Sequence, residues 1–334
     1  MHWLALDIGG AQLKAADGLG YAASQMFPLW EKPLQLTEAL RGMLRAAPAC
    51  DHLAVTMTGE LADCFTTRTE GVQFILSAVS MVAEQRHTRV YLSDGLLMAP
   101  QLALRSPLKV AAANWHALAK YCGRFTRPGL AVLVDIGSTT TDIIPILDGK
   151  VATRSQTDTD RLLAGELVYT GVQRTPVAAV AAILPYRKNL IPAATERFAT
   201  TWDVFITLGL LPEEPANLHT ANGKPATRLH ARDRLARMLC LDRDAFDEAD
   251  AATLAEGVLR QQLGQIATGW GHVTGRFDQP VTSVVISGQG EFLARQLLER
   301  LRINCPVVAL SAELGPQLSR CAPAHALAVL AREG

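Results

Sequence analysis

The sequence predicts an α/β fold that is duplicated into two lobes with a central cleft, and three observations lead to this prediction. A short apolar strand followed by Asp-Ile-Gly occurs at Asp7–Gly9 and again at Asp135–Gly137. A third apolar segment is followed by the glycine turn Ser287–Gly290. With 334 residues, the chain is also long enough for two domains. A weak internal repeat of about 130 residues therefore organises the chain.

The first unit, residues 1–127, alternates strands with helices. Apolar and polar residues alternate around Gly9-Gly10, which predicts a hairpin with a tight glycine turn. Apolar residues at helical spacing predict helices further along. The expected elements are strands over 3–6, 12–16, 52–57 and 89–92, and helices over 33–47, 72–84 and 115–121.

The second unit, residues 128–334, follows the breaker Arg127-Pro128-Gly129 and restarts the same pattern. A region near 186–247 is rich in Pro, Arg and Thr, and we expect an insertion that shapes a substrate site. We expect the last helix, at about 323–333, to pack back on the first lobe. The expected elements are strands over 130–134, 142–147, 281–286 and 305–309, and helices over 228–239, 292–301 and 323–332.

Composition excludes several classes of protein. Lys plus Arg equals Asp plus Glu at 32 each, which gives no electrostatic case for nucleic acid or an anionic membrane. The six cysteines form no Cys-x-x-Cys pair, as expected for free thiols in a cytoplasmic protein. The start of the sequence does not read as a signal peptide, and no apolar stretch is long enough to span a bilayer. A homo-oligomer is compatible with these properties.

The two Asp-Ile-Gly turns have the chemistry of a phosphate site with a metal. Glycine lets the main chain approach a phosphate closely, and converging N–H groups bind its oxygens. A carboxylate before each turn can hold Mg²⁺, or another divalent cation, that the phosphates share. The predicted metal ligands are Asp7 and Asp135. The predicted phosphate-binding residues are Gly9, Gly10, Gly137, Ser138, Thr139, Thr140, Gly288 and Gly290.

These three segments resemble the two phosphate motifs and the adenosine motif of the actin-like superfamily of sugar kinases, Hsp70 and actin, with its duplicated ribonuclease-H-like fold. More narrowly, the chain resembles the hydantoinase/oxoprolinase-related proteins linked to the tetrahydromethanopterin C1-transfer pathway. The matching stretches cover most of the chain and lie at 56–61, 134–145, 165–176, 196–201 and 234–238. The stretch at 165–176 is the specific one.

That resemblance implies a reaction of methanofuran biosynthesis. An (aminomethyl)furanmethyl diphosphate is joined to the phenol of γ-glutamyltyramine, or of a tyrosine analogue, and diphosphate leaves. ATP is then not required, because the phosphate turns hold a substrate diphosphate. The phenol needs a base, for which Glu60 and Glu166 are candidates, although Glu166 also suits the first turn of a helix. Arg174 could clamp phosphate or a glutamyl carboxylate, or it could be a helix cap or a salt bridge.

Two other function classes fit the same turns. One is an ATP-dependent enzyme, either a small-molecule kinase or an oxoprolinase-like hydrolase. The other is a nucleotide-binding regulatory or assembly protein, which the insertion near 186–247 argues against. Lys14 lies near the first turn, where a solvated strand lysine is an ordinary finding.

Overall fold

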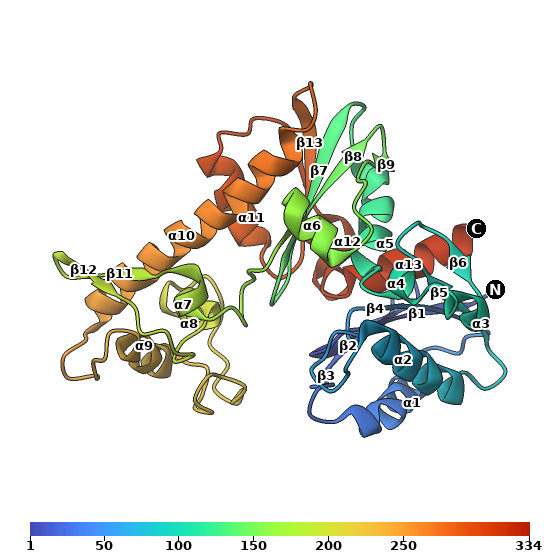
Figure 1. Ribbon diagram of the computed structural model, residues 1–334, viewed down its shortest axis with the longest axis horizontal. Coiled ribbons are helices and arrows are strands. Elements are labelled where there is room, and N and C mark those ends of the chain that lie inside the picture. The colour runs from blue at the N-terminus through green and yellow to red at the C-terminus, as the bar shows by residue number, and fades with distance from the viewer.

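The computed structural model describes residues 1–334, and its first lobe is built on a six-stranded mixed sheet (Figure 1). The central strand β1 pairs antiparallel with β2 and parallel with β4. Buried aliphatic side chains fill most of β1 and β4, as a strand covered on both faces requires. In spatial order the strands are β3 (Ala22–Met26), β2 (Gln12–Ala16), β1 (Trp3–Ile8), β4 (His52–Met57), β5 (His87–Tyr91) and β6 (Leu97–Met98).

The second lobe repeats this arrangement. Its central strand β7 pairs antiparallel with β8 and parallel with β13. In both lobes the central strand carries the aspartate of an Asp-Ile-Gly turn at its carboxyl end. The repeated order confirms the predicted actin-like α/β fold of two lobes. The spatial order is β10 (Leu167–Val168), β8 (Thr141–Leu147), β7 (Leu130–Ile136), β13 (Val281–Ser287) and β14 (Val307–Ala309), with β9 (Lys150–Val151) paired to β8.

Two helices cross between the lobes. Helix α5 (Asn114–Cys122) belongs to the first unit, yet Trp115 and Leu118 pack in a core with β7, β8 and β13 of the second sheet. Helix α13 (Ala322–Glu333) ends the second unit, yet Leu327 and Ala328 pack in a core with β1 and β4. The two helices also contact each other (Figure 1). Each sheet is therefore covered in part by a helix of the other unit.

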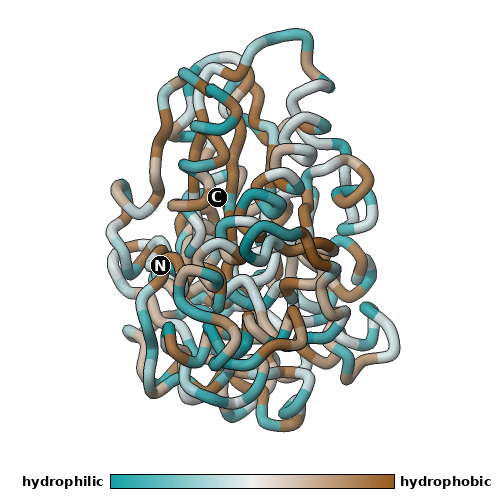
Figure 2. The backbone as a smooth tube through the Cα atoms, turned by 90° about the vertical axis from the view of Figure 1, so that its left-hand side faces the viewer, coloured by the Kyte–Doolittle hydropathy of each residue, from teal (hydrophilic) through white to brown (hydrophobic).

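Along the chain, hydrophobic stretches alternate with polar ones, as expected for helices that bury one face (Figure 2). Helix α2 begins at Arg68, earlier than predicted, because the Thr67 side chain accepts a hydrogen bond from the backbone N–H of Glu70 and caps it. The other helices of the two lobes are η1 (Pro33–Gln35), α1 (Leu36–Ala46), α2 (Arg68–Ala83), α3 (Pro100–Ala103), α4 (Pro107–Val110), η2 (Gly123–Phe125), α6 (Asp158–Ala164), α11 (Glu291–Arg300) and α12 (Leu310–Ser319).

No helix of the structure combines the length and the apolar character that crossing a membrane requires.

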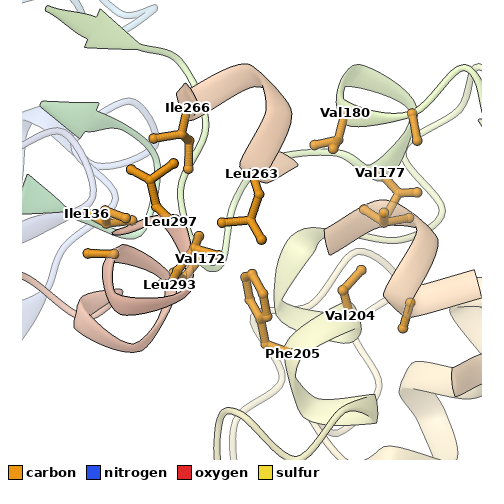
Figure 3. Close-up of a cluster of buried hydrophobic side chains, with 14 of the residues drawn as sticks. Ile136, Val172, Val177, Val180, Val204, Phe205, Leu263, Ile266, Leu293 and Leu297 are labelled. Atoms are coloured by element: carbon orange, nitrogen blue, oxygen red, sulfur yellow. The ribbon is translucent and has the colours of Figure 1, made fainter. Parts of the chain in front are cut away.

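An arm extends from the second lobe along helix α10 (Glu248–Thr274), whose 27 residues span about 40 Å (Figure 1). One hydrophobic core runs from the second sheet through α11 into the arm (Figure 3). Phe205 of the arm packs against Phe292 of α11. The buried pair Asp203 and Arg234 joins α8 to α9 inside the arm. The arm contains α7 (Val177–Val180), β11 (Ile183–Tyr186), β12 (Asn189–Pro192), α8 (Thr201–Thr207) and α9 (Arg228–Arg237).

Candidate functional site

The first turn follows β1 and closes the β1–β2 hairpin. The N–H of Gly9 donates to the carbonyl of Gln12 at 3.0 Å, and a Cβ at Gly9 would lie 2.8 Å from that oxygen. The N–H groups of Thr58 and Gly59 both donate to the carbonyl of Ile8 at 3.0 Å. Gly10 has open space around its Cα, with no atom within 4 Å of an added Cβ. Gly9 therefore shapes the turn, and Gly10 is the glycine that a ligand can approach.

The second turn follows β7 and rests on residues 171–174. The N–H of Gly137 donates to the carbonyl of Thr140 at 2.9 Å, and the N–H of Arg174 donates to the carbonyl of Ser138 at 2.9 Å. A Cβ on Gly171 would lie 2.5 Å from the nitrogen of Thr139. Residues 171–174, which belong to the stretch 165–176, therefore fix the position of the second turn through their backbone.

The glycines of the predicted phosphate set differ in what their N–H groups do. Those of Gly9, Gly137 and Gly290 already donate to backbone carbonyls, so these residues shape the turns and do not offer free donors. Gly288 packs so closely that an added Cβ would lie 2.7 Å from Oδ1 of Asp135. The predicted residues whose N–H groups take no part in a backbone hydrogen bond are Gly10, Ser138, Thr139, Thr140 and Gly288.

The structure brings the two predicted metal ligands into electrostatic contact. Burial raises the pKa of Asp7, while Lys14 and the Asn114 side chain lower it. Burial, and to a lesser extent the charges of Asp142 and Asp7, raise the pKa of Asp135 to about 6, against the lowering effects of Ser287 and Lys14. Lys14 is half-buried and pairs in register with Asp7, so it acts on both aspartates. Lys14 is thus a partly exposed strand lysine whose charge acts on both aspartates.

The strand ends at the first turn also carry buried polar atoms without a hydrogen-bond partner. Oδ1 of Asp7 and Oγ1 of Thr56 are both in this state, and the two residues pair in register between β1 and β4. An unpaired buried polar atom is costly unless water, a metal ion or a ligand satisfies it. No group of three or more His, Cys, Asp or Glu side chains could hold a metal ion alone. Two aspartates nevertheless fit Mg²⁺, which usually takes one or two carboxylates and completes its shell with waters and phosphate oxygens.

Glu60 follows β4 and is almost fully buried. Burial raises its pKa to about 7; Asp158 adds to this shift, and Arg68 opposes it. Its Oε2 has no partner. Arg68 of the first lobe lies 3.9 Å from Asp158 of the second, so Glu60 sits beside an ionic contact between the lobes. A carboxyl group with this pKa can accept a proton near neutral pH.

Glu166 has a different environment. Its Oε1 accepts a hydrogen bond from Arg276 at 2.7 Å, and its Oε2 accepts one from Thr153 at 2.6 Å. It follows Gly165, the left-handed residue that ends α6, so the alternative placement in the first turn of a helix is wrong. Glu166 is buried and both of its oxygens accept hydrogen bonds, one from Arg276 and one from Thr153, so the geometry favours a stabilising role for it and Glu60 as the better candidate base.

Arg174 is neither a helix cap nor part of a salt bridge. Its guanidinium stacks on the ring of Trp30, with Cζ 4.8 Å from the ring centroid, and Trp30 belongs to the first lobe. Burial and the neighbouring Arg197 lower the pKa of Arg174, while Tyr169 acts in the opposite direction. Sequence reasoning missed Trp30 because its partner is far away in the chain and no local pattern marks it.

A polar cavity of about 190 Å³ lies elsewhere at the junction of the lobes. Its lining comes from Ser93, Asp94 and Lys109 of the first unit, His116 of α5, and residues 151–156 of the second unit. None of the predicted site residues lines it. The turns combine buried polar atoms without a partner, in Asp7, Thr56 and Glu60, with raised carboxyl pKa values, and we take this combination as the stronger mark of a functional site.

A model of the hydantoinase/oxoprolinase family matches residues 51–333. A (4-{4-[2-(gamma-L-glutamylamino)ethyl]phenoxymethyl}furan-2-yl)methanamine synthase from Methanocaldococcus jannaschii is 33% identical over 332 residues, which cover 98% of this chain and 96% of that enzyme. The enzyme of the same name from Methanococcus vannielii is 29% identical over 201 residues, covering 60% of this chain and 89% of that one. Among solved structures, the ROK hexokinase from Thermus thermophilus aligns over 100% of both chains with a TM-score of 0.45 and 15% identity.

Proposed function

Since the chain belongs to the hydantoinase/oxoprolinase family, we propose that it is a diphosphate-releasing transferase of methanofuran-type biosynthesis. It joins an (aminomethyl)furanmethyl diphosphate to the phenol oxygen of γ-glutamyltyramine or a tyrosine analogue. The observation that carries this proposal is identity of 33% over nearly the whole chain to a synthase whose name describes such an ether. On this proposal the enzyme works in the cytoplasm with a divalent cation such as Mg²⁺, and ATP takes no part.

The reaction exchanges one C–O bond for another. The phenol oxygen forms a bond to the furan-bearing CH₂ carbon, the bond from that carbon to the diphosphate oxygen breaks, and the phenolic proton passes to a base. The electron-rich furan stabilises positive charge on the CH₂ carbon, so the leaving group can depart early. The protein must therefore neutralise the charge of the diphosphate, align the phenol oxygen with the CH₂ carbon and take up the phenolic proton.

On this proposal the second turn binds the diphosphate leaving group, and Lys14 compensates part of its negative charge. The N–H groups of Ser138, Thr139 and Thr140 bind its oxygens, and Gly10 adds a donor from the first lobe. The half-buried ammonium of Lys14 reduces the repulsion between the diphosphate and the two aspartates. Asp7 and Asp135 would hold the divalent cation, which supplies further neutralisation of the leaving group when it is bound.

Glu60 is the proposed base. A phenol has a pKa of about 10, and a carboxyl group with a pKa of about 7 is a much better proton acceptor than an exposed glutamate. The oxygen that lacks a partner in the protein, Oε2, is the atom available for the proton. An ATP-dependent kinase or hydrolase is the alternative that would use the same turns, and the assay below separates the two.

The test is to incubate the protein with a furanmethyl diphosphate, γ-glutamyltyramine and Mg²⁺, and to measure ether and diphosphate together. The proposal expects equal amounts of both products without ATP. Asp135→Ala should abolish turnover and retain the thermal unfolding transition of a folded protein. Ether that forms only when ATP is added would refute the proposal in favour of an ATP-dependent enzyme. Near-normal turnover of Asp135→Ala would remove that residue from the metal site.

A further inference from the structure

We propose that the guanidinium of Arg174, held on the indole of Trp30, binds the diphosphate leaving group between the two turns. This inference rests on the proposed function, which puts a diphosphate at the second turn, and it adds a cation that connects the two lobes. Arg174 contacts the ligand itself, and Trp30 is a positioning residue that fixes where the guanidinium lies.

Trp30 is fixed to the first turn by the residue that precedes it. The N–H of Leu29 donates to the carbonyl of Gly10 at 2.9 Å. The Leu29 side chain is fully buried and packs on Gly59, where an added Cβ would lie 2.8 Å from Cδ2 of Leu29 and 3.2 Å from the carbonyl carbon of Gly9. Because Gly10 is the glycine that a ligand can approach, Trp30 begins beside the open part of the first turn.

Arg174 is fixed to the second turn by its own backbone. The N–H of Arg174 donates to the carbonyl of Ser138 at 2.9 Å, and the N–H of Gln173 donates to the same oxygen at 3.0 Å. Ser138 is also the first of the consecutive residues 138–140 whose N–H groups take no part in a backbone hydrogen bond. The side chain of Arg174 therefore begins beside the backbone donors that are proposed to hold the diphosphate.

The side chains of Trp30 and Arg174 meet across the two lobes. Trp30 lies between β3 and η1 of the first lobe, and Arg174 lies between β10 and α7 of the second. Cζ of Arg174 is 4.8 Å from the centroid of the indole. Since one partner begins beside Gly10 and the other beside Ser138, the guanidinium lies between the two turns. An anion bound to it therefore occupies the same region as the free N–H groups of both turns.

The hydrogen-bonding capacity of this guanidinium is unused within the protein. Arg174 is half-buried, and its side chain forms no salt bridge and donates no hydrogen bond. Partial burial of a cation without acceptors for its N–H groups is costly. Stacking on the indole uses the face of the guanidinium, so the N–H groups along its edge stay free. An anion at that edge supplies the missing acceptors.

The charge of the site favours the diphosphate as this anion. A diphosphate carries more negative charge than Lys14 alone neutralises, and the ionised forms of Asp7 and Asp135 add to that charge. A planar guanidinium binds two phosphate oxygens through parallel hydrogen bonds, which a lysine ammonium does not. Its stabilising effect grows as the C–O bond breaks, because the departing diphosphate gains charge. The glutamyl carboxylate of the acceptor fits the same fork, so its binding to Arg174 is the competing outcome of the test.

Trp30 affects diphosphate binding in two ways. Its indole face limits the conformations of the Arg174 side chain, so less side-chain freedom is lost when the diphosphate binds. Because Trp30 comes from the first lobe, a diphosphate held by Arg174 also stabilises the arrangement in which the two turns face each other. Phenylalanine at this position keeps an aromatic face and should preserve most of both effects, whereas leucine keeps only the bulk.

The test measures the binding of inorganic diphosphate in the presence of Mg²⁺ by titration calorimetry, so that it does not depend on turnover. Loss of a charge-assisted hydrogen bond should raise the Kd of diphosphate by about 10- to 100-fold in Arg174→Gln. Arg174→Lys should recover part of the loss, because it keeps the charge without the fork. Trp30→Leu should raise the Kd by about two- to fivefold, and Trp30→Phe should raise it less.

Ether formation then shows which substrate Arg174 binds. The furanmethyl diphosphate and γ-glutamyltyramine are varied in turn with the wild type and Arg174→Gln. The substitution should raise the KM for the furanmethyl diphosphate and lower kcat, since the charge on the leaving group is no longer neutralised in the transition state. The KM for γ-glutamyltyramine should change less than about threefold.

Arg187→Gln is the matched control. Arg187 also stacks on an aromatic ring, with Cζ 4.9 Å from the centroid of Tyr186, but it lies in the β11–β12 hairpin of the arm. We expect this substitution to leave the Kd of diphosphate and both KM values unchanged. Thermal unfolding of each variant shows whether a loss reflects misfolding, and the partial recovery in Arg174→Lys separates a lost ligand contact from a lost fold.

The outcomes separate this inference from the proposed function. An equal Kd of diphosphate in the wild type and Arg174→Gln overturns the inference alone. So does a raised KM for γ-glutamyltyramine with an unchanged Kd of diphosphate, which would assign Arg174 to the acceptor carboxylate. An equal rise of the Kd in Arg187→Gln would reflect only the lost positive charge and would also overturn it.

A wild type that makes no ether overturns the proposed function, whereas calorimetry still decides whether Arg174 binds a diphosphate. A wild type that binds no inorganic diphosphate overturns both.

Discussion

The substitution Gly171→Ala tests whether the position of the second turn controls turnover. An added Cβ would lie 2.5 Å from the nitrogen of Thr139 and 2.6 Å from the carbonyl oxygen of Gly137, and both contacts are to backbone. An ordinary contact needs about 3.4 Å, so the turn must shift by roughly 1 Å. Overpacking of this kind costs about 1–3 kcal/mol of stability. A displacement of about 1 Å at a reacting centre costs on the order of 100-fold in rate.

The assay is ether formation with γ-glutamyltyramine, paired with urea unfolding of the same protein. Gly264→Ala is the matched control, because Gly264 lies within α10 and an added Cβ meets nothing within 4 Å. That control should keep its activity and gain about 0.5–1 kcal/mol, since alanine is the better helix former. Wild-type turnover in Gly171→Ala would refute the reasoning, because it would mean that the second turn moves freely or takes no part in the reaction.

Three further substitutions test the carboxylates. Because burial raises the pKa of Glu60 to about 7 from 4.5, the folded state keeps a proton that the unfolded chain loses, and stability should fall as pH rises between these values. The free energy of unfolding should fall by about 3 kcal/mol in total over this pH range. In Glu60→Gln, urea unfolding measured against pH should no longer show this fall, and most of the turnover should be lost. Glu166→Gln should lower the free energy of unfolding by about 1–3 kcal/mol, because the charged contact with Arg276 is lost. Its turnover per folded molecule should stay the same, and a large fall in kcat would instead identify Glu166 as the base. Asp203→Asn should lose about 3–5 kcal/mol because Arg234 is left buried without its counter-charge, and the double variant Asp203→Leu/Arg234→Met should recover most of it; equal unfolding midpoints of the single variant and the wild type would contradict this.

The turns could be predicted from sequence because their signal is local. An apolar strand, an aspartate and a glycine occur within a few residues, and the fold repeats them. The sequence could not show which backbone N–H groups are free to bind a ligand. Those of Gly9 and Gly137 donate within their own turns and close the hairpins. Which N–H groups remain free depends on the turn geometry, which a residue pattern does not specify.

Helix α10 shows a second limit of the sequence. Its buried residues are spread around the helix because strands, α8, α9 and α11 pack on different sides of it, so no single apolar stripe appears. Glycines also lower its helix propensity. Two of them are needed for close packing: a Cβ at Gly257 would lie 2.7 Å from Pro185, and one at Gly269 would lie 2.7 Å from Val168. Tertiary contacts here override a weak local preference.

Several candidate residues have surroundings that depend on long-range contacts. The candidate base Glu166 pairs with Arg276, which lies 110 positions away in the chain. Trp30 and Arg174 come from different lobes and acquire their meaning only when the lobes are placed together. The effect of Lys14 on Asp135 is of the same kind, because Lys14 belongs to the first unit and Asp135 to the second.

The duplicated lobes have diverged in chemistry, and this divergence suggests how they share the work. The second turn supplies three of the five predicted residues with free N–H groups, which supports the proposal that this turn holds the diphosphate. The first lobe supplies Glu60 and the unpartnered oxygen of Asp7, which suit proton uptake and a cation. Neither lobe has a complete set. We infer that catalysis requires both lobes to meet around the substrates, and the contact of Arg68 with Asp158 and the stacking of Arg174 on Trp30 are the interactions that would couple their approach to binding.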